Sequence, residues 1–135
     1  MTPCIVSLLR AALASSGCSN VPTADLDQHA SIELEFPNIP NIVVDRSEYD
    51  AVVLFCNLDA KLGRLRALPT TSILDIVATK ATWARYHAIS LLEEDGSLYL
   101  TAVVADHCLQ DGEGFSIALD GFYQRVCALC GVAPQ

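Results

Sequence analysis

The spacing of hydrophobic residues changes several times along the chain, and each change marks a predicted element. Residues 2–16 read as a helix because Thr2 suits the N-cap, Pro3 the first helical position and Gly17 the position after the last turn. The apolar stripe of this segment recurs at helical spacing and consists of Ile5, Leu8, Leu9, Ala12 and Leu13. A polar connector over residues 17–28 follows.

Beyond the connector the period shortens to two, which is typical of strands. In "SIELEF" (31–36) hydrophobic and acidic residues alternate, so one face of a strand is buried and the other is exposed. Prolines at 37 and 40 interrupt this run. "NIVVD" (41–45) and "YDAVVLFCNL" (49–58) predict two further strands, joined by a short polar turn.

The second half of the chain predicts a helix, a hairpin and a closing helix. After a loop at 59–71, a second helix is expected at about 72–87, with Ser72 and Asp75 as a capping-box pair. Asp95-Gly96 between two apolar runs is a strong hairpin signal. "GFSIALDGFYQRVCALC" has the apolar stripe of a third helix, which ends at Gly131.

The resulting order is helix, three strands, helix, two strands, helix. Hairpin and meander connections predict a twisted, mainly antiparallel sheet with helices packed on it, so the fold class is α+β. At 135 residues without an internal repeat, residues 1–135 are expected to form a single domain.

The net charge of the chain limits the classes of partner that it is expected to bind. The chain has 16 acidic and 8 basic residues, a formal net charge of −8, which argues against binding to nucleic acid or to an anionic membrane surface. No run reaches the ~18 apolar residues of a membrane span, and the N-terminal stretch lacks the basic start of an export signal. We therefore expect a cytoplasmic protein whose six cysteines are reduced thiols.

Cys127 and Cys130 form a C-x-x-C pair, a spacing used by zinc ligands and by thiol oxidoreductases. A structural zinc site usually has two such pairs, and here there is one. The pair also lies at the C-terminal end of a predicted helix, where the helix dipole disfavours a thiolate. Packing as small hydrophobic residues is the favoured interpretation, so no metal and no other cofactor is expected.

No catalytic constellation is evident either. The sequence has no nucleophile-elbow, phosphate-loop or dinucleotide-binding pattern, and its carboxylates look dispersed rather than paired. The three histidines are scattered, and no nucleophile is evident beside His107. We therefore predict no catalytic residues and no enzymatic activity.

The predicted second helix points to an interface. Its apolar residues cover an arc of roughly 180°, wider than the ~100° stripe that one core face requires. Small residues allow close approach, and Trp is enriched at interfaces. This pattern predicts a homodimer interface along this helix, with Trp83 and the small Ala84 among its residues.

The predicted sheet gives a second indication of a partner. Val53 and Phe55 oppose Val52 and Leu54, so this strand is apolar on both faces, and Leu92 similarly opposes Leu91. Three helices are not expected to cover both faces of a five-stranded sheet. Leftover apolar surface on an acidic protein usually marks a partner site, such as one for an extended peptide.

Taken together, these features resemble the class I type III secretion chaperones of Gram-negative bacteria. "LLRAALASSG…ADLDQHASIELEF" is similar to the family's first helix, connector and strand. "ISLLEEDGSLYLTAVVADHCLQDGEGFSIALDGFYQRVCALC" is similar to its hairpin and closing amphipathic helix. The usual Gly-rich sequence between the second helix and the fourth strand is missing.

The resemblance implies cytoplasmic homodimers without enzymatic activity, which dimerise largely through the second helix. The dimer contacts that it implies in this sequence are Ile73, Ile76, Val77, Lys80 and Trp83. It also implies that an N-terminal segment of a cognate secreted effector is held in extended form and kept competent for secretion. The effector contacts implied in this sequence are Leu8, Leu9 and Leu13 on the first helix and Val53, Phe55 and Leu92 on the sheet.

Two other hypotheses remain open at this stage. A small dimeric α+β scaffold, similar to roadblock subunits, would bind folded partners instead of an unfolded segment. A thiol- or zinc-dependent enzyme would use Cys127, Cys130 and His107 together.

Overall fold

The computed structural model describes residue 9, residues 31–46 and residues 51–133 of the chain, and every structural statement below concerns these residues. Their elements follow the order β1 (Ile32–Leu34), β2 (Ile42–Arg46), β3 (Val52–Asn57), η1 (Asp59–Lys61), α2 (Leu62–Ala67), α3 (Thr70–Ala78), β4 (Ala84–Glu94), β5 (Ser97–Val104), η2 (Asp106–Leu109) and α4 (Gly112–Cys130). The predicted first helix at 2–16 lies outside this set except for Leu9, which is helical and has no exposed surface.

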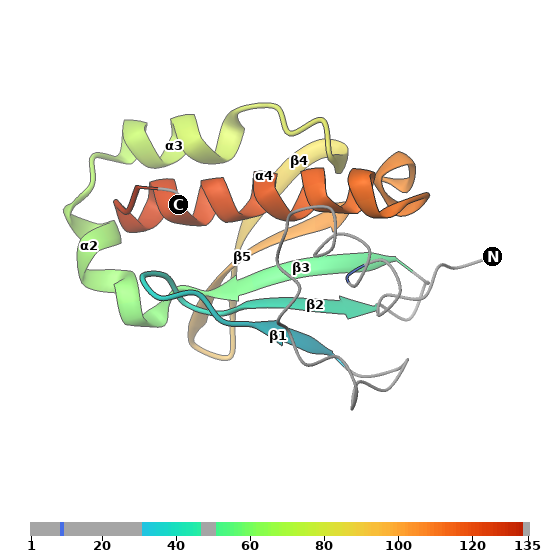
Figure 1. The fold of residues 1–135 in the computed structure, drawn as a ribbon. Coiled ribbons are helices and arrows are strands. Elements are labelled where there is room, and N and C mark those ends of the chain that lie inside the picture. The colour runs from blue at the N-terminus through green and yellow to red at the C-terminus, as the bar shows by residue number, and fades with distance from the viewer. Residues whose placement is uncertain (1–8, 10–30, 47–50, 134–135) are drawn as a thin grey trace.

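The strands form one five-stranded antiparallel sheet in the order β1-β2-β3-β5-β4. The two edges of the sheet are therefore the short strand β1 and the longer strand β4. In Figure 1, α4 crosses one face of the sheet and α3 runs alongside α4, away from β1, β2 and β3. The predicted α+β class, with a mainly antiparallel sheet and helices packed on it, is confirmed.

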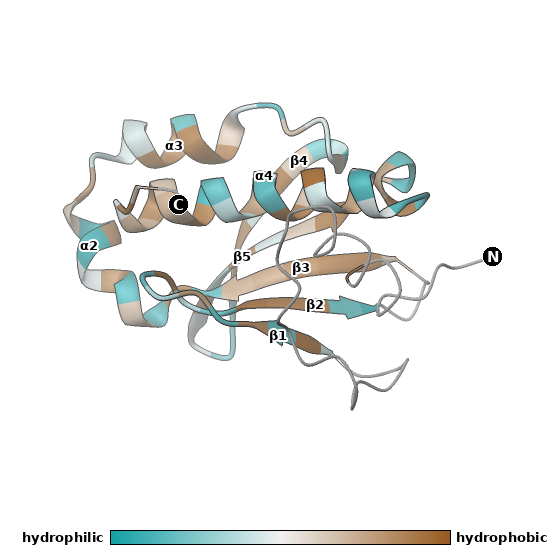
Figure 2. Cartoon of the chain, viewed as in Figure 1, coloured by the Kyte–Doolittle hydropathy of each residue, from teal (hydrophilic) through white to brown (hydrophobic). Residues whose placement is uncertain are grey.

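The sheet has two different faces because side chains alternate along each strand. The inner face, toward α4, is closed: Val52, Leu54 and Cys56 of β3 have no exposed surface. The outer face is only half-buried, as in Val53 and Phe55 of the same strand. Figure 2 shows β2 and β3 as largely hydrophobic, whereas α4 alternates between hydrophilic and hydrophobic turns.

Helix α4 supplies the inner side of the core. Asp111 caps its start by accepting a hydrogen bond of 2.7 Å from the Gly114 N–H. Gly131 ends the helix in the left-handed conformation (φ 69°), as the sequence predicted. Its buried stripe consists of Phe115, Ala118, Phe122, Val126, Cys127, Leu129 and Cys130.

The Asp95-Gly96 hairpin is also confirmed. Both residues have positive φ angles, 53° and 82°, and Glu94 pairs with Ser97 across the turn. Strand β4 is irregular near its start, where its register with β5 shifts between Ala84 and Ile89. Within this stretch, Tyr86 and His87 both adopt positive φ angles.

The region between β3 and β4 differs from the prediction. The expected loop at 59–71 contains the short helices η1 and α2, and α3 starts at Thr70 after Pro69, without a side-chain cap. The predicted helix at 72–87 is wrong at its C-terminal half, because α3 ends at Ala78 and β4 begins at Ala84. The wide apolar arc that the sequence predicted for this helix therefore combined residues of α3 with residues at and before the start of β4.

Long-range contacts explain why the helix stops. The Ala105 N–H donates a 2.8 Å hydrogen bond to the carbonyl of Trp83, and Ala84 pairs with Val104. At the helix end, the Thr79 hydroxyl donates to the Asp75 carbonyl, a local bond that competes with continuation of the helix. Pairing with β5 therefore draws residues 83 and 84 into the sheet.

Candidate protein-binding surfaces

The predicted sheet contacts Val53, Phe55 and Leu92 come together on the outer face. They line one open hollow of about 410 Å³ together with Tyr99 and Thr101, with Glu94 and Asp95 at the hairpin end. Register explains the grouping: Phe55 pairs with Thr101, and Leu92 pairs with Tyr99. We call this the outer-sheet hollow.

Aromatic packing shapes the floor of the hollow. The rings of Phe55 and Tyr99 meet edge to face, with centroids 6.1 Å apart and planes at 77°. Leu92, on the edge strand β4, leaves 45% of its surface exposed. Tyr99 and Thr101 were not singled out from the sequence, although they alternate with the apolar residues Leu98, Leu100 and Ala102, which predicts that they point to the other face.

Of the three predicted contacts on the first helix, one belongs to the described residues. Leu8 and Leu13 lie outside the described residues. Leu9 belongs to the hydrophobic core and has no exposed surface, so it is not an exposed effector contact within the protomer. Its substitution by Asp would place a charge in the core, where the main consequence is loss of stability.

The predicted dimer residues divide into two groups. On α3, Ile73, Ile76 and Val77 are partly buried and pack against the core, while Lys80 follows the helix and is exposed. No side chain of α3 is fully buried, and Leu74, which the prediction omitted from the interface, is 57% exposed. This helix therefore leaves part of its apolar surface exposed to solvent.

The other group, Trp83 and Ala84, is misplaced in the prediction. Both residues lie beyond α3 and are buried within the protomer, with 7% and 1% of their surfaces exposed. The Trp83 ring packs edge to face on Phe122, with centroids 6.2 Å apart. Replacing Trp83 by a charged residue would consequently disrupt the core of one chain, so it cannot report on dimer formation alone.

Arg125 of α4 holds the C-terminal end of α3. Its guanidinium donates hydrogen bonds to the carbonyls of Ile76 (2.6 Å), Thr79 (3.0 Å) and Lys80 (3.2 Å). Carbonyls at a helix C-terminus lack partners within the helix, and a cation there also suits the helix dipole. Sequence reasoning missed this residue because it lies 45 to 49 positions from its partners.

The cysteine pair is buried at the end of α4. Cys127 has no exposed surface and Cys130 has 4%, as expected for side chains that pack in the core. Burial raises the pKa of the Cys130 thiol above its ordinary value, although the nearby Lys61 opposes this shift. Burial, together with the neighbouring Cys130 thiol, raises the pKa of Cys56 to about 12. Such thiols remain protonated and unreactive at neutral pH.

The thiol-enzyme hypothesis requires His107 beside the cysteine pair, and the fold separates them. His107 lies in η2, immediately before α4, whereas Cys127 and Cys130 lie in the last turn of that helix. At 1.5 Å per residue, α4 is roughly 28 Å long. Within residues 9, 31–46 and 51–133, no three His, Cys, Asp or Glu side chains gather in a way that could hold a metal ion.

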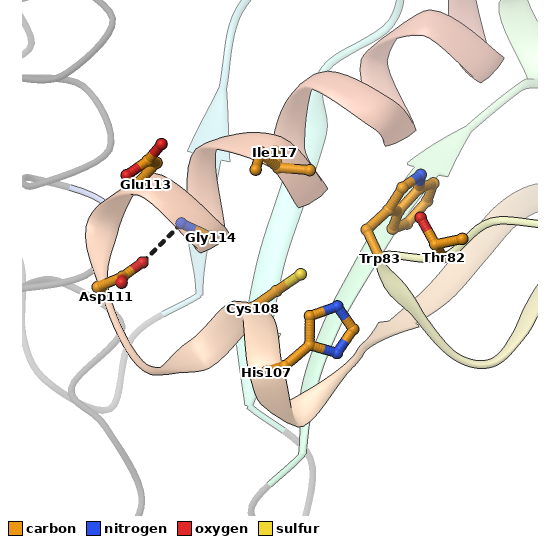
Figure 3. A pocket seen from close by; sticks show the side chains of 8 residues that line it. All are labelled: Thr82, Trp83, His107, Cys108, Asp111, Glu113, Gly114 and Ile117. Carbon is orange, nitrogen blue, oxygen red and sulfur yellow. Dashed lines mark hydrogen bonds between the residues drawn. The ribbon is translucent and has the colours of Figure 1, made fainter.

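His107 instead lines a second open hollow at the start of α4. Figure 3 shows its side chain beside Cys108, with Thr82 and Trp83 to one side and Asp111 and Glu113 to the other. Burial and the nearby Asp111 raise the pKa of the Cys108 thiol. The dashed line marks the Asp111–Gly114 cap, so this carboxylate already has a structural role.

With this geometry in place, comparison with known proteins shows what the chain is similar to. The model of the Invasion protein B family matches residues 17–95. Surface presentation of antigens protein SpaK of Salmonella typhimurium strain LT2 is 34% identical over 119 residues, which cover 88% of this chain and 87% of that protein. The protein of the same name from Salmonella typhi matches equally.

The fold has a counterpart among solved structures. A chain of the heterodimeric ExoU–SpcU complex from the type III secretion system of Pseudomonas aeruginosa superposes with a TM-score of 0.52. The match has 18% sequence identity and covers 94% of this chain and 95% of that one. At this identity the likeness concerns the fold alone.

The chain belongs to the Invasion protein B family. This is a family of type III secretion chaperones, so the resemblance drawn from the sequence is confirmed. It is a chaperone family and not an enzyme family, which favours the chaperone prediction over the scaffold and the thiol-enzyme alternatives. Among the helices that the structure describes, none is long and apolar enough to cross a membrane.

Proposed function

We propose that this type III secretion chaperone holds an extended N-terminal segment of a cognate secreted effector against its outer-sheet hollow. The observation that carries the proposal is that Val53, Phe55 and Leu92 all line the outer-sheet hollow, although they come from two strands far apart in sequence. An effector kept partly unfolded exposes apolar segments, and covering them prevents aggregation before export. In this role the chain acts in the bacterial cytoplasm, where the effector is made.

The outer face suits an extended segment better than a folded partner. It is an antiparallel sheet surface on which half-exposed side chains alternate with buried ones at a period of two. An extended peptide has the same period, so successive outward side chains can occupy successive rows of the sheet.

We also propose a homodimer that forms through α3. The helix is the outermost described element on its side of the molecule, and it exposes Leu74 beside the partly buried Ile73 and Val77. Ile76 and Lys80 complete the proposed surface. Trp83 and Ala84 no longer belong to it, because both are buried in the protomer.

Effector capture can be tested by co-expression with a candidate secreted effector, followed by co-purification and limited proteolysis. We expect a protected N-terminal segment of the effector, and a lower yield of complex for Leu92→Ser. Ile117→Ser is the matched control, because Ile117 is also an exposed apolar residue (56%) but lies on α4. Equal capture by both variants would remove the hollow from the effector site.

The dimer can be tested by sedimentation of Leu74→Lys, which should shift the chain from dimer to monomer. A charged side chain on the interface leaves the folded protomer intact, because Leu74 is largely exposed. Ile117→Lys again serves as the control and should remain dimeric. If Leu74→Lys sediments like the parent chain, the α3 interface is wrong.

A further inference from the structure

The charged side chains that line the outer-sheet hollow are all acidic. Its lining includes the carboxylates of Glu94 and Asp95 and no basic side chain. The hollow between α2, α3 and the hairpin is balanced by contrast, because Arg66 and Glu93 both line it. The apolar floor of the outer-sheet hollow is thus bordered at one end by negative charge alone.

We propose that this border selects the effector segment by charge: the hollow takes an apolar side chain that has Lys or Arg two positions away in the same segment. The inference rests on the proposed effector site and specifies its ligand. Leu92 and Glu94 are two residues apart on one strand, and both line the hollow. They are therefore separated by about 6.6 Å along the strand, the i to i+2 spacing of any extended peptide.

An extended partner laid along β4 reproduces this spacing. A side chain that covers Leu92 and the Phe55–Tyr99 floor places the next residue on the same face near Glu94 and Asp95. A cation at that position gains attraction from two carboxylates, whereas an anion is repelled. The apolar contact supplies most of the affinity, and the charge supplies discrimination.

The same charges argue against a second copy of this chain in the hollow. The chain carries a net charge of −8, with 16 acidic against 8 basic residues. Docking one copy into the acidic border of another would bring like charges together in most orientations. The occupant favoured by this complementarity is a segment with basic residues between its apolar anchors.

The test is a selection from a random library of 12-residue peptides displayed on phage, with the full-length chain immobilised. Three targets are compared: the parent chain, the double variant Glu94→Gln/Asp95→Asn, and Leu92→Ser. The double variant is conservative because Asn-Gly is a favoured hairpin turn and Gln keeps the size of Glu. Melting curves of all three targets verify that they are folded.

We expect peptides selected on the parent chain to be enriched in an apolar residue with Lys or Arg two positions before or after it. On the double variant the apolar enrichment should remain and the basic enrichment should disappear. A synthetic peptide from the first pool should bind the double variant about two- to fivefold more weakly at low salt, the range of exposed ion pairs. The difference should shrink as salt is raised.

Failures of the two proposals give different results. Selected peptides that depend on Leu92 but show no preference for a basic residue overturn the charge inference and leave the effector site standing. Pools that are identical on the parent and on Leu92→Ser, or no selected peptides at all, overturn both. A change in self-association caused by Leu92→Ser would assign the hollow to a second copy and also overturn the inference.

Discussion

The indole of Trp83 lies directly against the backbone of Gly121, so α4 passes the ring at a point where the helix has no side chain. A Cβ atom at position 121 would lie only 2.6 Å from Cδ1 and Cε2 of the ring. The next residue, Phe122, meets the same indole edge to face. This contact joins the start of β4 to the middle of α4 and explains why Trp83 is a core residue.

Gly121→Ala should therefore destabilise the chain, although Ala is the better helix former. Overpacking costs about 1–3 kcal/mol, which exceeds the gain of up to about 1 kcal/mol from helix propensity. Urea unfolding followed by the fluorescence of Trp83, the single tryptophan, measures the difference directly. Gly63→Ala on α2 is the control, because a Cβ there meets nothing within 4 Å. A Gly121→Ala variant as stable as the Gly63→Ala variant would contradict the packing.

Arg125→Met should loosen α3 without unfolding the rest of the molecule. The nine-residue helix is too short to be stable alone, and the guanidinium supplies three hydrogen bonds to carbonyls at its end. We expect amide exchange within α3 to accelerate about tenfold or more, since hydrogen bonds to charged groups contribute about 1.5–3 kcal/mol. The strands should keep their protection.

Two further variants serve as comparisons for Arg125→Met. Gln124 is the residue before Arg125, and it donates an exposed 2.8 Å hydrogen bond to Asp120. Gln124→Met removes this bond and should leave α3 unchanged. Arg125→Lys keeps the charge but loses the forked geometry, so its exchange rates should fall between those of the parent and Arg125→Met. Exchange rates in α3 that do not respond to either Arg125 variant would show that the helix is held by its apolar side alone.

Cys56 should make the chain sensitive to alkaline pH. Its folded-state pKa is raised to about 12 from 9.0, chiefly because burial disfavours the thiolate. The protonated thiol is thus favoured by folding, so its contribution to stability is complete below pH 9.0 and decreases as the pH rises toward 12. Unfolding free energies measured at pH 8 and about 10 should differ less in Cys56→Ala than in the parent. An identical decrease in both proteins would assign the alkaline loss to other groups.

Asp59 should contribute the opposite dependence at acid pH. Its pKa is lowered from 3.8, first because the carboxylate accepts the Leu98 N–H at 2.9 Å and then through the side chains of Ser97 and Asn57. This contribution is present above pH 3.8 and decreases as the pH falls through the lowered value.

Asp59→Asn keeps an acceptor oxygen for Leu98 but does not titrate, so its unfolding midpoint should fall less steeply between about pH 4 and 2. Asp75→Asn, at an exposed position of α3, is the control. Parallel acid profiles for the parent chain and Asp59→Asn would show that the bond to Leu98 does not depend on the charge.

Local sequence signals were sufficient for much of the fold. The Asp95-Gly96 turn, the alternation in β3 and the stripe and Gly131 end of α4 were all predicted, since each depends on residues close in sequence. The same alternation placed Val53, Phe55 and Leu92 on an uncovered face, and the structure brings them into one hollow.

The prediction failed where distant contacts outweigh local preference. Residues 79–87 fit a helix by spacing, but pairing of Ala84 with Val104 and the slot at Gly121 for Trp83 make this segment a turn and a strand. No local pattern contains either partner, because each lies 20 or more positions further along the chain.

The sequence by itself thus determined the α+β class, the family and the apolar side chains available for binding, because period, turn residues and charge are local properties. Only the tertiary structure decided which of those side chains remain exposed. Trp83 and Leu9 became core residues, while Leu92 and Leu74 stayed on the surface. Exposure depends on what packs above a residue, and in this protein the covering groups come from distant positions such as Gly121 and Phe122.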